Sequence, residues 1–188
     1  MGRWEPNARE RLERAALDLF IEHGFDQVTV PEITARAGLT TRTFFRHFAD
    51  KREVLFADSD QMPLLAARLV LGAPPELGPV EVVAHGFPTL AFEAFEGRLG
   101  QIKRRKIVMD GNAGLREREL RKMEELVDAI RQAFEDRGVT AVTAAVVAET
   151  AVGLVKVSLS RWIESDGREP LQTVMADSLQ QLHDAFVS

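Results

Sequence analysis

Arg42 and Arg46 are the residues of this sequence whose types and spacing favour a defined chemistry. If the segment is helical, a separation of four residues puts both guanidinium groups on the same side. A guanidinium matches the two acceptors on a guanine edge, and the neighbouring threonines offer a hydroxyl and a methyl group suited to thymine. The pattern therefore favours contacts to base edges in the major groove of DNA.

The residues expected to contact DNA fall into two groups, those on the base-reading face and those that hold phosphates. Arg42 is expected to read bases together with Thr41 and Thr43. The full set on the outward face is Thr41, Arg42, Thr43, Phe45 and Arg46, and the set expected to hold phosphates is Thr29, Thr40, His47 and Lys51. Phe45 can press on a sugar or a thymine methyl group but cannot donate a hydrogen bond.

The segment 29–48 must position these side chains, and it reads as two short helices around a tight turn. Thr29 and Glu32 form a capping box, in which two helix amides are satisfied reciprocally. Gly38 stands where a left-handed residue ends the first helix. The sequence therefore predicts a helix that stops abruptly before Leu39.

The second helix begins at Thr40, which is a preferred residue type for the N-cap. Phe44 and Phe48 then share one face, which leaves the arginine face outward. Together the two helices have the form of a helix-turn-helix. A helical hairpin without a DNA-binding role remains the alternative.

The stretch from about Arg9 to Leu55 resembles the TetR family of bacterial transcriptional regulators. The resemblance rests on Gly24-Phe25, Val28-Thr29-Val30, Ile33-Thr34-Ala35, Ala37-Gly38-Leu39, Thr43-Phe44-Phe45-Arg46-His47-Phe48 and Asp50-Lys51. In that family the stretch is a three-helix DNA-binding domain. The family usually has tyrosine where Phe45 stands, and its hydroxyl often contacts phosphate, so the resemblance does not carry over that contact.

The periodicity of the whole chain predicts an all-α protein of about nine helices, since no strand pattern of period two is visible. We expect a three-helix DNA-binding domain with the helix-turn-helix over residues 1–50. Residues 51–188 are expected to form a helical domain that binds an effector and dimerises.

Four local features carry further expectations. A capped helix is expected to start at Lys51, and Pro63 should kink or break it near Met62. The basic run Lys103–Lys106 is interpreted as a solvated helix face. The segment Asp110–Gly114 is interpreted as a plain loop.

The helix expected at about 141–164 carries a seam of apolar residues at alternating spacings of four and three, typical of close helix packing. Its members are Ala141, Ala145, Ala148, Val152, Val155, Leu159 and Trp162, and a stripe on the last helix adds Leu171, Met175, Leu182 and Phe186. Two such helices can pair with their copies as a four-helix bundle, and the family resemblance implies this interface. A core helix within one chain explains the seam equally well.

A ligand cavity is expected between helices of the second domain, because apolar clefts with a few polar groups bind small molecules. The candidates for its lining are His85, Phe87, Phe92, Phe95, Met109, Met123, Arg161 and Trp162. Ordinary core packing remains the alternative for each of them. The scattered histidines lack metal spacing, no catalytic signature stands out, and we expect no metal, no cofactor and no enzymatic activity.

Charge and composition give weaker indications. The net charge is −5, and residues 1–56 hold nine basic and nine acidic residues, so the excess acid lies in the remainder. There is no cysteine, and the polar stretch Met1–Asn7 lacks a signal pattern. The apolar stretch 141–159 is interrupted by Glu149 and Lys156, which favours a core helix over a membrane span. We expect a soluble cytoplasmic protein.

These expectations combine into a hypothesis of function. The first candidate is a homodimeric repressor that binds an operator in double-stranded DNA and is released by a small-molecule effector. The second is a helical small-molecule-binding protein or enzyme with a vestigial helix-turn-helix. An activator with the same DNA-binding end is a third possibility.

Overall fold

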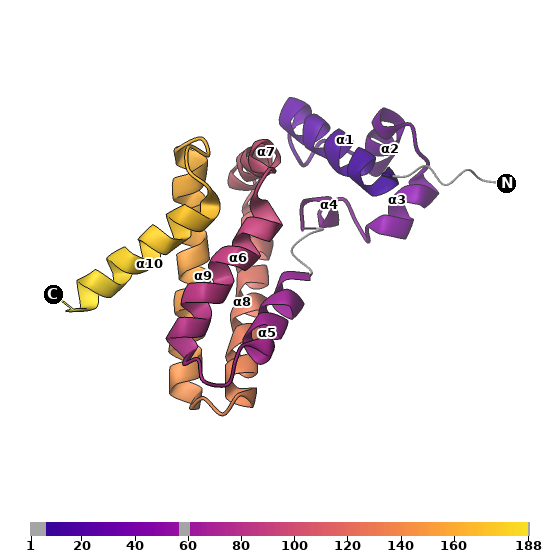
Figure 1. The fold of residues 1–188 in the computed structure, drawn as a ribbon. Coiled ribbons are helices and arrows are strands. Elements are labelled where there is room, and N and C mark those ends of the chain that lie inside the picture. Colours follow the sequence, from indigo (N-terminus) through magenta and orange to yellow (C-terminus); the bar gives the residue numbers. More distant parts are fainter. Residues whose placement is uncertain (1–6, 57–60, 188) are drawn as a thin grey trace. The chain divides into compact units, whose positions relative to one another are not determined.

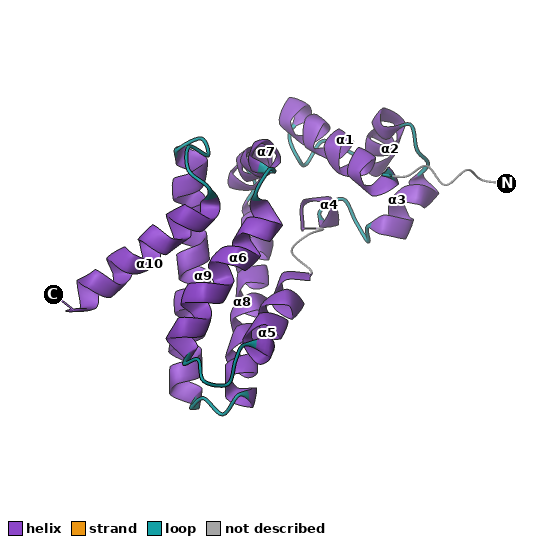
Figure 2. Cartoon of the chain, in the orientation of Figure 1, coloured by secondary structure: helices purple, strands orange, loops and turns teal. Residues whose placement is uncertain are grey.

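The structure is a computed structural model that describes residues 7–56 and 61–187, and these residues form ten helices without a strand (Figures 1 and 2). The helices are α1 Ala8–His23, α2 Val30–Ala37, α3 Thr41–His47, α4 Glu53–Phe56, α5 Met62–Gly72, α6 Pro79–Phe95, α7 Leu99–Asp110, α8 Ala113–Asp136, α9 Ala141–Glu164 and α10 Leu171–Val187. The all-α prediction is confirmed. The count exceeds nine because α4 and α5 are both described where one helix from Lys51 was expected, and α5 begins at Met62 with Pro63 in its first turn. The connection between them lies outside the described residues.

The described residues form two compact units. The amino-terminal unit contains residues 7–56 and 101–119, and the carboxy-terminal unit contains residues 61–100 and 120–187. This division differs from the expected boundary at residue 50. The reason is that α4 and the segment 101–119 supply apolar side chains to the core of the amino-terminal unit, among them Phe56, Met109 and Leu115.

The three-helix part of the amino-terminal unit follows from its apolar periodicity. α1 buries Leu12, Leu19 and Phe20 on one stripe, as their spacing of seven and eight residues requires. Ile33 of α2 is fully buried against the same core. In α3, Phe44 is fully buried and its ring lies 5.4 Å from that of Phe48. The buried phenylalanines fix which face of α3 turns outward.

Local capping sets the ends of α2. The carboxylate of Glu32 accepts hydrogen bonds from the Thr29 amide and hydroxyl, each at 2.7 Å, and the Glu32 amide lies 3.5 Å from the Thr29 hydroxyl oxygen. Gly38 adopts a φ of 64°, in the left-handed region that glycine enters at little cost. The predicted capping box and the predicted helix end are both confirmed.

The basic run Lys103–Lys106 is a solvated helix face only in part: Lys106 is exposed, but the two arginines contact the amino-terminal unit, which that interpretation did not foresee. Arg104 pairs with Asp18 of α1. Arg105 lies 5.3 Å from the centre of the Phe56 ring and within 3.9 Å of the Glu119 carboxylate. The guanidinium groups therefore hold α7 to the core of the amino-terminal unit.

The expected loop at 110–114 also has a structural role. The side-chain oxygen of Asn112 accepts from the Leu115 amide at 3.0 Å and so caps α8. Its amide nitrogen donates to the Asp26 carboxylate at 3.1 Å. Arg118, one turn further along α8, pairs with Glu53. The capped helix expected from Lys51 begins two residues later, at Glu53, and the Asp50 carboxylate caps it by accepting from the amides of Arg52 and Glu53 at 2.7 and 3.1 Å.

The carboxy-terminal unit packs α5, α6, α9, α10 and the later turns of α8 around a core that includes Phe87, Phe134 and Trp162. Figure 1 shows α6 and α9 running side by side while α10 crosses them and extends beyond. Gly86 allows α5 and α6 to approach closely, since a Cβ there would lie 2.6 Å from the Leu69 side chain.

Arg137, just after α8, organises the connection between α5 and α6. Its guanidinium donates to four backbone carbonyls, those of Val70 at 3.0 Å, Ala73 at 2.5 Å, Pro74 at 2.9 Å and Leu77 at 3.3 Å. Carbonyls at the end of a helix have no partner within it. One side chain thus satisfies the end of α5 and fixes the linker that follows.

Among the described helices, α9 is the one whose length and composition would let it cross a membrane. It packs instead against α6 and α10, with Ala144, Ala148 and Trp162 buried. Glu149 and Lys156 lie on its exposed side. This arrangement is that of a core helix with one side uncovered.

Candidate nucleic-acid interface

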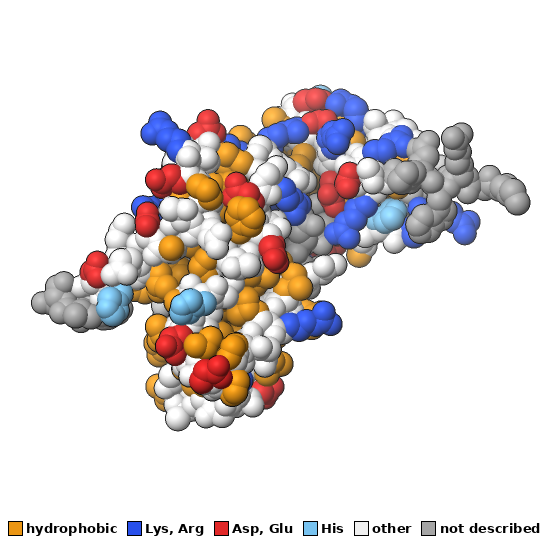
Figure 3. Space-filling model, in the orientation of Figure 1, with side chains coloured by type: hydrophobic (Ala, Val, Ile, Leu, Met, Phe, Trp, Pro, Cys, Tyr) orange, Lys and Arg blue, Asp and Glu red, His pale blue; other side chains and the backbone are white. Residues whose placement is uncertain are grey.

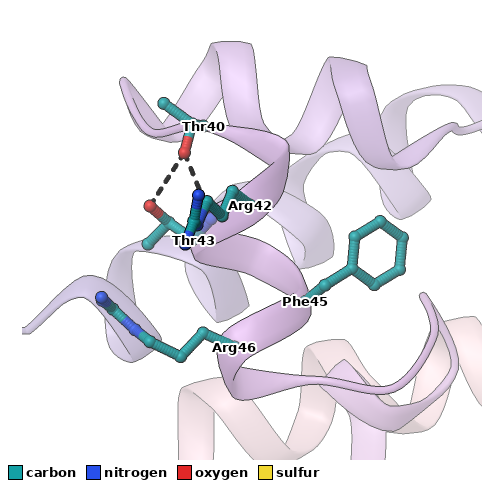
Figure 4. Close-up of a pocket in the computed structure, with 5 residues that line it drawn as sticks. All are labelled: Thr40, Arg42, Thr43, Phe45 and Arg46. Carbon is teal, nitrogen blue, oxygen red and sulfur yellow. Dashed lines mark hydrogen bonds between the residues drawn. The ribbon is translucent and has the colours of Figure 1, made fainter.

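The outward face of α3 gathers most of the residues expected to contact bases. Thr40, Arg42, Thr43, Phe45 and Arg46 line one open hollow of about 480 Å³. Figure 4 shows Arg42, Thr43 and Arg46 extending to one side of α3 and Phe45 to the other. Thr41 is exposed next to them but does not line the hollow. The structure thus brings together two guanidinium groups, hydroxyl groups and one aromatic ring.

The first turn of α3 fixes two of the threonines. The Thr40 hydroxyl oxygen accepts from the Thr43 amide at 3.1 Å and lies 3.0 Å from the Thr43 hydroxyl oxygen (Figure 4). This is the expected N-cap, and the hydroxyl pair orients both side chains. Because the two hydroxyls share one hydrogen bond, one of their two protons is left to donate to a phosphate or a base.

Phe45 is an exposed apolar residue on a surface otherwise rich in polar groups. Its side chain is 56% exposed, and its ring meets that of Phe44 edge to face at 5.4 Å. The buried Phe44 ring thereby limits where the Phe45 ring can lie. An aromatic ring held in this way can contact a thymine methyl group or a sugar.

Arg11 holds the turn between α2 and α3, a role that the sequence did not indicate. Its Nη2 donates to the Ala37 carbonyl at 2.6 Å, at the last residue of α2. A Cβ on Gly38 would lie 3.0 Å from the same nitrogen. A cation at a helix carboxy terminus also complements the helix dipole. Arg11 therefore fixes the geometry from which α3 projects.

The geometry of Lys51 does not fit the expected phosphate contact. Its Nζ lies 2.8, 3.2 and 2.9 Å from the carbonyl oxygens of Phe25, Asp26 and Val28. It also lies 4.5 Å from the centre of the Phe25 ring. An ammonium group has three donors, and all three are used. Lys51 therefore links the residues just before α4 to the connection between α1 and α2.

Thr29 likewise uses its hydrogen-bond donors within the protein. Its hydroxyl and amide both donate to Glu32. These hydrogen bonds hold the pKa of the Glu32 carboxyl below its ordinary value, so the group stays ionised. A carboxylate at this position disfavours a phosphate beside Thr29, and the expected contact would require the capping box to open.

His47 lies at the end of α3, with its Nε2 3.5 Å from Arg46 Nη2. Partial desolvation of its ring lowers the pKa of His47 below its ordinary value, and the charges of Arg46 and Arg9 lower it further. Its imidazole is exposed. The position suits the expected phosphate contact.

In the structure, the inward side of α9 coincides with only part of the expected seam. The residues of the expected interface that are buried within the single chain are Ala148, Val152, Trp162, Leu171 and Met175. Those that remain exposed or half-buried are Ala141, Ala145, Val155, Leu159 and Leu182, and the side chain of Phe186 lies outside the described part. Val142, Val146 and Val157 of α9 are 77%, 61% and 54% exposed, and no expectation included them.

The expected cavity residues do not converge on one hollow. Phe87, Met109 and Trp162 are buried in core packing, with Met109 in the amino-terminal unit. Phe92 is exposed, and Phe95 and Met123 are half-buried. Arg161 donates to the Ser178 hydroxyl at 2.7 Å. His85 lines a shallow hollow of about 340 Å³ between α5 and α6.

Comparison with known proteins bears on both units. Residues 13–57 match the profile of the family described as bacterial regulatory proteins, tetR family. A stretch of 46 residues is 48% identical to the HTH-type transcriptional regulator TcmR of Streptomyces glaucescens, covering 24% of this chain. The matched stretch spans only 20% of the length of TcmR.

Solved structures extend the likeness of fold to nearly the whole chain. A TetR-family transcriptional regulator from Syntrophomonas wolfei superposes with a TM-score of 0.65 at 18% identity, covering 97% of this chain and 96% of the other. The regulator FadR of Bacillus subtilis, solved in complex with stearoyl-CoA, superposes with a TM-score of 0.58 at 16% identity, covering 92% and 96%. At these identities the likeness concerns the fold.

Proposed function

We propose that this chain, a member of the TetR family of bacterial regulatory proteins by its amino-terminal unit, is a homodimeric transcriptional repressor. It binds an operator in double-stranded DNA through α3 and leaves it when a small-molecule effector binds. The observation that carries the proposal is the outward face of α3, where Arg42, Thr43 and Arg46 extend together from a helix fixed by its buried phenylalanines.

DNA binding is tested most directly on duplexes selected from a random pool. Two bound copies should select paired half-sites about 34–36 Å apart or a multiple of that distance. Failure to enrich any sequence, together with no mobility shift on the DNA upstream of the gene, would favour the alternative of a small-molecule-binding protein with a vestigial helix-turn-helix.

Substituting Arg42 by alanine should relax sequence choice. The expected loss is about 1–3 kcal/mol on the selected operator, because the forked contact to a base edge disappears. On a scrambled duplex the loss should be much smaller, since phosphate contacts dominate there. Titration of both duplexes by fluorescence anisotropy checks this. Equal losses on the two duplexes would remove Arg42 from the base-reading role.

A second copy of the chain is the proposed occupant of the open side of α9. Val142, Val146 and Val157 are exposed on that side. Gly153 lies between them, and a Cβ placed there would meet no neighbouring heavy atom. Glycine inside a helix costs about 1 kcal/mol relative to alanine, and a close approach of another helix would explain its presence. Ala141, Ala145, Val155 and Leu159 flank this side, and Leu182 would join them from α10.

Val146→Glu should weaken the dimer by about tenfold or more, because a buried unpaired charge costs more than the roughly 1.4 kcal/mol of a tenfold step. Val80→Glu is the matched control, since Val80 is 65% exposed on α6. Analytical ultracentrifugation of both variants gives the measurement. A dimer that tolerates glutamate at position 146 would place the interface elsewhere.

The effector is proposed to be a small molecule with a large apolar part. FadR of Bacillus subtilis, of similar fold, was solved with stearoyl-CoA. To move the population from 1:99 to 99:1, an effector must prefer the released state by about 5.5 kcal/mol. Val108, Met109 and Leu115 lie in the same core as the packing face of α3, so a shift of α7 or α8 would disturb the position of the recognition helix.

A further inference from the structure

The shallow hollow between α5 and α6 is formed by none of the residues assigned to DNA contacts. Its volume of about 340 Å³ lies at the lower end of the range for small-molecule sites. Its lining is mostly apolar, and Leu69, Leu77 and Val82 supply the largest apolar side chains. Figure 3 shows hydrophobic side chains gathered over the part of the view that α5 and α6 occupy. The hollow therefore offers a surface for a short apolar chain.

A glycine and an arginine keep this hollow open. A Cβ on Gly72 would meet no heavy atom within 4 Å, and Gly72 does not have a positive φ that would require glycine. Glycine weakens a helix, so the property that explains its presence is the space that it leaves. Arg137 donates to the carbonyls of Ala73, Pro74 and Leu77, which all line the hollow. The wall on that side is thus fixed before any ligand binds.

The ionisable residues that line the hollow are Arg68 of α5 and His85 of α6, and both are exposed. Arg68 has no ion-pair partner among the described residues. His85 Nδ1 donates to the Glu81 carbonyl at 2.7 Å, which leaves Nε2 for a ligand. The Glu81 carboxylate accepts from the Gly78 amide at 2.7 Å, and Glu76 is exposed but does not line the hollow. The charge beside the apolar lining is therefore positive and suits an anion.

We propose that this hollow binds a carboxylate with a short acyl chain, and that such a compound is the effector of the proposed repressor, on whose function this inference rests. The acyl chain covers the apolar lining. The carboxylate bonds to Arg68, because a guanidinium matches the two oxygens of one carboxylate.

Arg137 links the hollow to the helix before it. A ligand that moves the linker moves the carbonyls that Arg137 holds at the end of α8. The first turn of the same helix supplies Leu115 to the core of the amino-terminal unit. Binding in the hollow therefore acts on the unit that carries α3.

The test measures binding of octanoate to the full chain by isothermal titration calorimetry, and octanol serves as the uncharged probe of the same chain length. Arg68→Gln removes the charge, and Arg168→Gln is its control, because Arg168 is another exposed arginine of the carboxy-terminal unit. Gly72→Leu fills the hollow. Gly100→Leu is its control, because a Cβ on Gly100 also meets no heavy atom within 4 Å.

Octanoate should bind the wild type more tightly than octanol does. Arg68→Gln should weaken octanoate binding by about threefold to tenfold and leave octanol binding unchanged. Gly72→Leu should remove the binding of both compounds, and the two control variants should bind them as the wild type does. Circular dichroism melts establish that each variant is folded. In fluorescence anisotropy, octanoate should release the selected duplex from the wild type but not from Gly72→Leu.

Three results would overturn the inference while DNA binding by the same chain keeps the proposed function in place. The first is octanoate binding that is absent from the wild type or unchanged in Gly72→Leu. The second is an affinity for octanol that equals or exceeds that for octanoate. The third is octanoate binding in the hollow without release of DNA. A chain that binds octanoate as expected but binds no duplex would overturn the proposed function instead.

Discussion

Replacing Lys51 by methionine is expected to destabilise the amino-terminal unit by about 2–4 kcal/mol and to impair DNA binding through loss of folded protein. The Lys51 ammonium donates to the carbonyls of Phe25, Asp26 and Val28. Methionine keeps most of the apolar stem but has no donor. Three carbonyls between α1 and α2 then lose their shared partner, and the connection that sets the start of α2 is released.

Thermal unfolding followed by circular dichroism measures this loss. Arg52→Met is the matched control, since it removes one positive charge from the adjacent, exposed residue. The result also decides between two roles for Lys51. If Lys51→Met melts like the wild type and instead lowers the salt slope of DNA binding by about one, the lysine holds a phosphate as the sequence suggested.

Replacing Arg137 by methionine is expected to destabilise the carboxy-terminal unit by about 2–4 kcal/mol, because four backbone carbonyls share this one guanidinium. The loss should be concentrated at the end of α5 and in the following linker. Hydrogen exchange should therefore accelerate at the amides of Ala73 and Leu77, which bond to Val70 and Pro74 in that turn.

Arg131→Met provides the comparison within α8. Arg131 bonds only to the nearby carboxylates of Asp128 and Glu135 on the helix surface. Such exposed pairs contribute little to stability, so its melting temperature should stay close to that of the wild type. If the two arginine variants melt alike, the carbonyl contacts of Arg137 do not hold the linker.

The parts of the fold that could be predicted from sequence are those whose partners lie within one helical turn. The Thr29–Glu32 box, the Thr40 cap and the left-handed Gly38 are each decided by residues three or four positions apart. Helix geometry fixes these separations before any tertiary contact forms. For the same reason the outward face of α3 could be assigned, since Phe44 and Phe48 determine its inward face.

Contacts between distant segments could not be predicted in this way. Arg104 and Asp18 are 86 positions apart, as are Asn112 and Asp26. A basic run has the same pattern whether it faces water or carboxylates of another helix. The sequence could therefore not indicate that residues 101–119 complete the amino-terminal unit.

The sequence by itself determined the two helices of the helix-turn-helix, their caps and the side chains that α3 presents. Only the tertiary structure decided which side of α9 turns inward, because apolar residues occupy nearly every side of that helix and several seams share the same spacing. Tertiary structure likewise gave Lys51 three carbonyl partners and Arg137 four. A long cationic side chain bonds to whichever acceptors the packed backbone brings within its reach, and only folding brings them there.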